Sequence, residues 1–172
     1  MLLLRKMLRA ARLDSALYRE VRDDTNATTE ALLVVILMVL GTVLGFVRPS
    51  IVLDLLAFVV IMVGLWMLWA WLAYLLATTI FRTPDTTATW GQMFRTAGYA
   101  QAPGALRIVL IVPLTFLPIV GQIMFLAIAV WQVTAMVVAV RQAMGYASIG
   151  RAVGVVLGGM TPFVFAILVL VG

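Results

Sequence analysis

Four long stretches of this chain contain no charged residue, and they restrict its possible folds more than any other feature. They cover 31–47, 55–81, 108–140 and 152–172. About 20 consecutive apolar residues are enough for a helix to cross the hydrocarbon core of a bilayer. With 65% hydrophobic and only 11% charged residues, the 172-residue chain cannot cover a water-facing surface. The sequence therefore predicts one all-α membrane domain, a polytopic helical bundle.

The third uncharged stretch is too long for a single span. A helix from Pro103 to Tyr146 would reach about 65 Å, roughly twice the bilayer core. Prolines at 113 and 118 and a glycine at 121 supply a break, so the chain is expected to fold back there. The result is five transmembrane helices, at about 31–47, 51–81, 103–117, 120–140 and 149–171. A re-entrant loop in place of the third span is the alternative.

The basic residues give this five-span arrangement an orientation. Basic residues near spans are retained on the cytoplasmic side of a membrane. With the N-terminus inside, only Arg48 falls outside, whereas a re-entrant third segment would leave nine basic residues inside and three outside. The sequence thus predicts a cytoplasmic N-terminus and an outer C-terminus, with Arg107 snorkelling to the inner surface. The eleven cytoplasmic basic residues are Arg5, Lys6, Arg9, Arg12, Arg19, Arg22, Arg82, Arg95, Arg107, Arg141 and Arg151.

Residues 1–28 form a separate N-terminal region ahead of the membrane domain at 29–172. At 100° per residue, apolar side chains fall on one face of a helix over 1–21 and basic ones on the other. Such a basic amphipathic helix lies in the headgroup region of an anionic leaflet, where each basic residue contributes about 1 kcal/mol. Packing on the inner ends of the spans is the alternative. The expected lipid contacts are Arg5, Lys6, Arg9 and Arg12.

A second interfacial helix is expected on the same cytoplasmic side, in the loop between the second and third spans. Trp90, Met93, Phe94 and Ala97 recur there at helical spacing, before Gly98 ends the run. Trp90 and Phe94 are its expected interfacial side chains. The predicted fold is therefore five spans and two amphipathic helices on one face.

Two groups of glycines predict close helix packing. Gly150, Gly154 and Gly158 are spaced by four in the last span, and Gly41 and Gly45 repeat this spacing in the first. Small residues on one helix face allow another backbone to approach closely in a membrane. Packing within one chain is the favoured interpretation, and a homo-oligomer contact is the alternative.

The inventory of chemical groups indicates a protein that is not an enzyme. The chain has no histidine and no cysteine, and its carboxylates lie near span ends or in the N-terminal region. No nucleophile motif or phosphate-binding loop occurs, so no catalytic residue, cofactor or metal site is expected. The basic charge lacks any zinc-finger or ribonucleoprotein motif, which argues against nucleic acid as a partner.

Two polar residues lie deep in the fourth span. Gln132 and Thr134 are expected to form hydrogen bonds between helices, and a polar pocket is the alternative use.

Two short motifs carry a resemblance to a known family. The first is Gly98-Tyr99-Ala100-Gln101-Ala102-Pro103, which precedes the proline-broken span. The second runs from Arg141 through Gly145-Tyr146-Ala147-Ser148 to Arg151, with Trp131 in the helix before it. Over about 29–172 the chain resembles the Ypt/Rab-interacting protein (YIP) family of five-span membrane proteins.

The resemblance implies a role at membranes. Eukaryotic members act in traffic between endoplasmic reticulum and Golgi, associate with small GTPases and help to shape membranes. They carry a longer cytosolic N-terminal region, so this chain is more similar to the compact prokaryotic members of the cytoplasmic (inner) membrane. We expect a non-enzymatic membrane organiser, scaffold or accessory subunit, working with anionic lipids as a homo-oligomer or in a larger complex. A small transporter, or a protein that binds a lipid or apolar solute, is the alternative.

Overall fold

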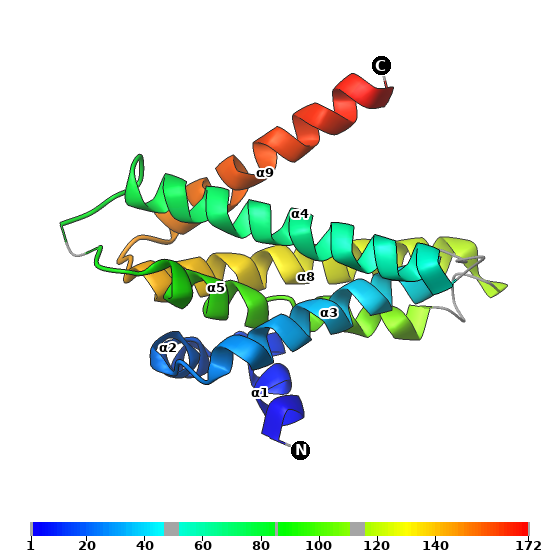
Figure 1. The fold of residues 1–172 in the computed structure, drawn as a ribbon, viewed down its shortest axis with the longest axis horizontal. Helices are drawn as coiled ribbons and strands as arrows, with labels where there is room; N and C mark the ends of the chain where they lie inside the picture. The colour runs from blue at the N-terminus through cyan, green and yellow to red at the C-terminus, as the bar shows by residue number, and fades with distance from the viewer. Residues whose placement is uncertain (1, 47–51, 85, 111–115, 172) are drawn as a thin grey trace.

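The computed structural model describes residues 2–46, 52–84, 86–110 and 116–171, and these form an all-helical bundle without strands (Figure 1). The predicted all-α class is therefore confirmed. The elements are α1 (Leu2–Ala11), α2 (Ser15–Asp23), α3 (Ala27–Phe46), α4 (Val52–Thr78), α5 (Trp90–Tyr99), α6 (Ala102–Ala105), the 3₁₀ helix η1 (Leu106–Leu110), α8 (Pro118–Met144) and α9 (Ile149–Val171).

Two of these helices are long and apolar enough to cross a membrane, at Asp54–Thr78 and Pro118–Met144. Only 17% and 28% of their most apolar stretches are buried inside the protein, so few of their side chains belong to its core. The core helix of a soluble protein would be mostly buried. Shorter apolar helices cover Ala27–Val43 and Ile149–Phe163 among the described residues. The outward-facing apolar side chains are typical of a membrane protein.

The long helices run in roughly the same direction, and shorter helices join them. In Figure 1, α4 and α8 run along the long axis; α5 contacts both of them, and α3 packs on α4 and α5. The first half of α9 packs on α4 and α8, and the remainder leaves the bundle (Figure 1). α5 contacts α2, α3, α4 and α8. Because these helices enclose it, all its residues from Met93 to Tyr99 are buried. The core thus extends from the N-terminal helices through α5 to the packed faces of α4, α8 and α9.

The single helix expected over 1–21 is two helices, and that prediction was wrong at its centre. Leu13 has a φ of 61°, which ends α1, and the Asp14 side chain accepts hydrogen bonds from the backbone N–H groups of Ala16 and Leu17. A carboxylate in this position caps the start of a new helix. Arg9 donates to Asp14 at 2.8 Å and holds the pKa of that carboxyl below its usual value. The two helices still bury one apolar face against the bundle, as predicted for a single helix. Its fully buried residues are Ala10, Leu17, Tyr18 and Val21.

The third span expected at 103–117 is not one α-helix in the described residues. α6 has four residues and passes directly into η1, a tighter 3₁₀ turn of five. Pro103 starts α6 well, but 3₁₀ geometry seldom extends further than this. The segment packs along α3. The outer turn around Arg48, and Pro113, lie outside the described residues.

Candidate functional site

A cluster of polar side chains lies inside the bundle around Arg107. Only 9% of Arg107 is exposed. Its Nη2 donates to Gln132 Oε1 at 2.7 Å, and its Nη1 donates to Thr42 Oγ1 at 3.2 Å. The arginine comes from η1, the glutamine from α8 and the threonine from α3. One guanidinium therefore joins three elements that are distant in the sequence.

Gln101 extends the cluster toward α5. Gln132 Nε2 donates to Gln101 Oε1, and Gln101 Nε2 lies 3.3 Å from the sulfur of Met136. Gln132 is near the middle of α8, about 18 Å of helix from Met144 at 1.5 Å per residue. The cluster consequently meets α8 near its middle, well away from either end of that helix.

The positive charge of Arg107 has no counter-ion among the described residues. The ion pairs of the described chain involve other residues: Lys6 with Glu30, Arg9 with Asp14 and Glu20, and Arg22 with Asp23. The guanidinium lies over the ring of Phe125, 4.9 Å from its centroid, and its Nε is buried without a hydrogen-bond partner. Neutral acceptors and an aromatic face thus compensate the charge only in part.

A cavity of about 220 Å³ adjoins this guanidinium. Its wall comes from η1, from one face of α8 and from α9. Most of the lining side chains are apolar, and the two polar ones are members of the cluster. The lining residues are Arg107, Ala129, Gln132, Val133, Met136 and Met160. The site therefore combines one buried cation with an apolar wall.

The expectation that Arg107 snorkels to the inner surface was wrong. The sequence places it four residues after Pro103, close to the predicted start of a span. The tight passage of α6 into η1 instead turns its side chain toward acceptors on α3 and α8. Without Arg107, the cytoplasmic count falls from eleven to ten basic residues. One feature of the sequence does point to this site. Arg107 is the only charged residue between Thr96 and Val140, and an isolated charge inside an apolar membrane segment usually faces the interior of the bundle.

The two polar residues predicted in the fourth span have different surroundings. Gln132 takes part in the cluster and lines the cavity. Thr134 is exposed, and its hydroxyl donates to the carbonyl of Val130 in the same helix. The two side chains therefore do not share a pocket, because residues two apart on a helix face different directions.

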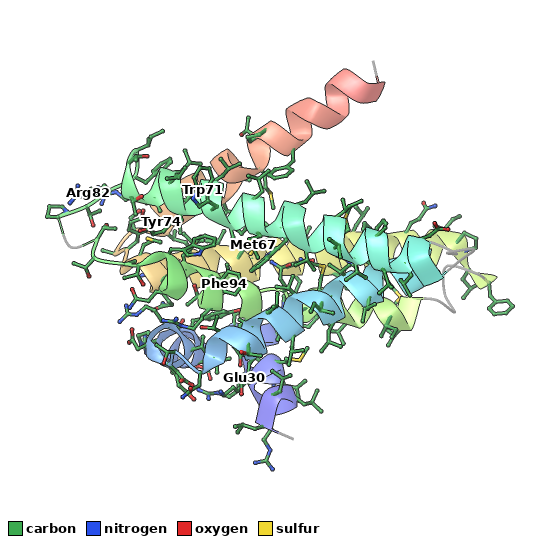
Figure 2. All side chains as sticks on the ribbon, viewed as in Figure 1. Glu30, Met67, Trp71, Tyr74, Arg82 and Phe94 are labelled. Atoms are coloured by element: carbon green, nitrogen blue, oxygen red, sulfur yellow. The ribbon has the colours of Figure 1, made fainter. Side chains whose placement is uncertain are left out.

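The first family-like motif forms the corner between α5 and α6. Gly98 lies against the backbone of Ala31, and the Tyr99 hydroxyl donates to Glu30. Glu30 is labelled near the start of α3 in Figure 2. Ala100 is fully buried, and Pro103 lies in the first turn of α6. The motif thus fastens this corner to α3.

The second motif forms the turn between α8 and α9. Gly145 ends α8 in the left-handed conformation, with a φ of 69°. Arg141 donates to the carbonyls of Tyr146 and Ala147, and the Ser148 hydroxyl accepts from the Gly150 N–H. Arg151 is exposed just after this turn. Trp131, further back in α8, donates from Nε1 to the carbonyl of Ala11 at 2.7 Å.

The glycines contact different partners. A Cβ at Gly41 would lie 2.9 Å from the Ala105 carbonyl oxygen, and at Gly154 it would lie 2.7 Å from the Phe81 ring. At Gly158 it would meet Leu76 at 3.1 Å, whereas Gly150 has only Ser148 nearby. Gly45 belongs to α3, and its surroundings lie outside the described residues. Gly41, Gly154 and Gly158 therefore face other elements of the same chain.

Of the expected interfacial residues, some face outward and others contact protein. Arg5 and Arg12 are exposed, while Arg9 pairs with Asp14 and Glu20. Lys6 donates to Glu30 at 2.7 Å, which ties α1 to α3.

The aromatic residues of α5 lie deeper than the sequence indicated. Phe94 is 8% exposed and packs edge-on against Trp66 of α4, with ring centroids 5.2 Å apart (Figure 2). Trp90 is half-buried and packs edge-on against Tyr74 of α4. The prediction that Phe94 contacts headgroups was wrong, because α2 and α4 cover this helix.

No group of three or more potential metal-ligating side chains occurs in the part of the chain that was described.

Comparison with known proteins gives one clear similarity. The family model described as Yip1 domain matches residues 14–172, which include α2 and all later elements. No curated protein and no solved structure matches the chain significantly. The family match agrees with the resemblance carried by the two motifs.

Proposed function

Since this chain belongs to the Yip1 domain family, we propose that it acts as a non-enzymatic organiser of membranes, as a scaffold or accessory subunit. The observation that carries the proposal is the apolar surface of the bundle. Large hydrophobic side chains are exposed along α4 and α8, among them Val60 at 71% and Val130 at 67%. Contact of such a surface with the acyl chains of a bilayer is favourable, whereas its exposure to water is costly.

We further propose five crossings with a cytoplasmic N-terminus, supported by the run of the helices and the position of the basic residues. α3, α4, α8 and α9 supply four apolar helices, and the segment through α6 and η1 runs along α3 past Gly41. Ten basic residues would then lie on the cytoplasmic side.

Single cysteines provide a test of this arrangement, because the natural chain has none. Thr87→Cys, in the exposed loop after α4, should react with a membrane-impermeant maleimide only after cells are permeabilised. Phe116→Cys, beside the start of α8, should react in intact cells. Ile123→Cys is the matched control, since it is exposed on the surface of α8 but would face lipid and stay unlabelled. Labelling of Ile123→Cys in intact cells, or a reversed pattern at the other two positions, would contradict the arrangement.

The grip on the cytoplasmic leaflet is proposed to come from α1. Leu4 and Leu8 are one turn apart, and 61% and 51% exposed. Arg5 is exposed on this helix and Arg12 in the turn directly after it, and α1 projects sideways from the bundle (Figure 1). Exposed leucines beside basic residues favour insertion at the boundary between headgroups and acyl chains.

Changing Leu4 and Leu8 together to serine should weaken this leaflet contact by about 2 kcal/mol without disturbing the core. Reconstitution into vesicles with anionic lipids provides the measurement, by electron cryomicroscopy of vesicle diameter. Wild type should shift the diameters away from those of protein-free vesicles, and the variant should shift them less. Thr87→Ser, in the exposed loop after α4, is the control. If wild-type protein leaves vesicle shape unchanged, the organising role is wrong.

A further inference from the structure

We propose that the cavity beside Arg107 binds the oxyanion head of an acyl amphiphile, with the acyl chain lying between α8 and α9. The ligand would be a long-chain carboxylate or a monoacylglycerol phosphate. This inference goes beyond the organising role and does not depend on it. It rests on the charge of the cluster, the chemistry of the cavity wall and the position of the cavity in the bundle.

The charge of the cluster identifies the head. Arg107 is buried, and its hydrogen-bond partners Thr42 and Gln132 are neutral. No described carboxylate pairs with it, although seven other charged side chains of the described residues form ion pairs at 2.7–2.9 Å. A buried cation is costly unless an anion is near, and such residues inside membrane proteins mark binding sites. A guanidinium is also the side chain whose geometry best suits a carboxylate or phosphate.

The wall of the cavity identifies the rest of the ligand. Ala129, Val133, Met136 and Met160 present only apolar atoms and thioether sulfurs. A small inorganic anion would leave this wall uncovered. An acyl chain would fill it, and methionine side chains adapt readily to a flexible chain.

The size of the cavity indicates how much of the ligand it encloses. Pockets that enclose a whole drug-sized molecule measure about 300–1,000 Å³. At about 220 Å³, this cavity has room for a head and the first few carbons. The remaining carbons need an exit toward lipid. We place this exit beside α9, because the second half of that helix leaves the bundle (Figure 1) and Leu157, one turn before Met160, is exposed.

Binding in detergent solution tests the proposal. Purified full-length protein is incubated with palmitoleate, with its methyl ester or with palmitoyl lysophosphatidic acid, a monoacylglycerol phosphate. Bound ligand is measured by native mass spectrometry. Wild type should bind one acid per chain, and the uncharged ester should bind at least about tenfold more weakly. Preference for the carboxylate would indicate a fatty acid, and preference for the phosphate would indicate a phospholipid acid. Binding of inorganic phosphate as tightly as of either amphiphile would overturn the acyl assignment.

Substitutions at Arg107 test whether this residue binds the acid group. Arg107→Gln should lose at least about tenfold in affinity for the acids and leave ester binding unchanged, because one charge-assisted contact is removed. Arg107→Lys should retain part of the affinity. Thr134→Val is the matched control: it changes a polar residue of α8 that lies two positions from Gln132 but donates only to Val130.

A second variant covers the case in which Arg107→Gln does not fold. Ala129→Leu leaves the guanidinium intact and fills the cavity, so it should block the acid and keep the thermal unfolding midpoint. Equal binding of acid and ester, full affinity in a folded Arg107→Gln, or unchanged affinity in Ala129→Leu would each overturn the proposal. A failure of the vesicle experiment would affect none of these readouts.

Discussion

Replacing Gly98 by leucine is expected to unfold the bundle at temperatures where the wild-type protein remains folded. A Cβ at Gly98 would lie 2.8 Å from the Ala31 Cβ and 3.0 Å from the Ala31 carbonyl oxygen. The obstacle includes backbone of α3, which cannot rotate away as a flexible side chain could. Overpacking of this kind costs about 3 kcal/mol or more. Because Tyr99 and Gln101 follow directly, the displacement would also disturb their hydrogen bonds.

The midpoint of thermal unfolding in detergent measures this effect, and Gly64→Leu is the matched control. Gly64 lies in α4 with nothing within 4 Å of an added Cβ, so the same substitution there should leave the midpoint unchanged or raise it. Gly98→Ala should lie between wild type and Gly98→Leu. Equal midpoints for Gly98→Leu and Gly64→Leu would show that the close approach of α5 to α3 is not what stabilises the fold.

Arg95→Ala is expected to release α2 from the bundle. Arg95 is 7% exposed, and its Nε lies 3.1 Å from the carbonyl oxygens of both Val21 and Arg22, while its Nη2 also donates to Arg22. These carbonyls belong to the last turn of α2, where they have no partner within the helix and the helix dipole is negative. The arginine thus supplies both the hydrogen bonds and the favourable charge. Its loss leaves buried acceptors unpaired, at a cost of about 2–4 kcal/mol.

Amide hydrogen exchange of the protein in nanodiscs measures the release of α2. The amides of α2 should exchange faster in Arg95→Ala, while those in the middle of α8 should keep their protection. Arg82→Ala, in the exposed loop after α4, removes the same charge from the same side of the bundle and should change neither. Unchanged protection of α2 in Arg95→Ala would mean that apolar burial of Leu17, Tyr18 and Val21 is sufficient to hold it.

The sequence predicted well what depends on apolar periodicity and composition. The uncharged stretches correspond to α3, α4, α8 and α9, since any helix of that composition must bury its side chains in protein or in lipid. The run ending at Gly98 also proved to be a helix, with a capping box at Thr89 and Gln92.

What the sequence did not predict depends on contacts between distant residues. Phe94 has the spacing of an interfacial side chain, yet it is buried because α2 and α4 fold over it, and no local pattern records that. Arg107 was assigned to the inner surface from its distance to Pro103 alone. Its acceptors, Thr42 and Gln132, are 65 and 25 residues away in the sequence. The 3₁₀ turn η1 brings Arg107 to these two acceptors, and short 3₁₀ turns are hard to predict from sequence.

The contacts of the N-terminal helices have a consequence for biosynthesis. Trp131 donates to Ala11 across 120 residues, and Arg19 donates to Gln142 across 123. At translation rates of about 5–20 residues per second, α1 and α2 would leave the ribosome roughly 6–24 s before these partners. Until α5 and then α8 follow, their apolar face lacks its main protein partners, and a basic helix with an apolar face can rest on the surface of the membrane. The leaflet would thus serve as a temporary partner for the N-terminal segment, until first α5 and then α8 replace it.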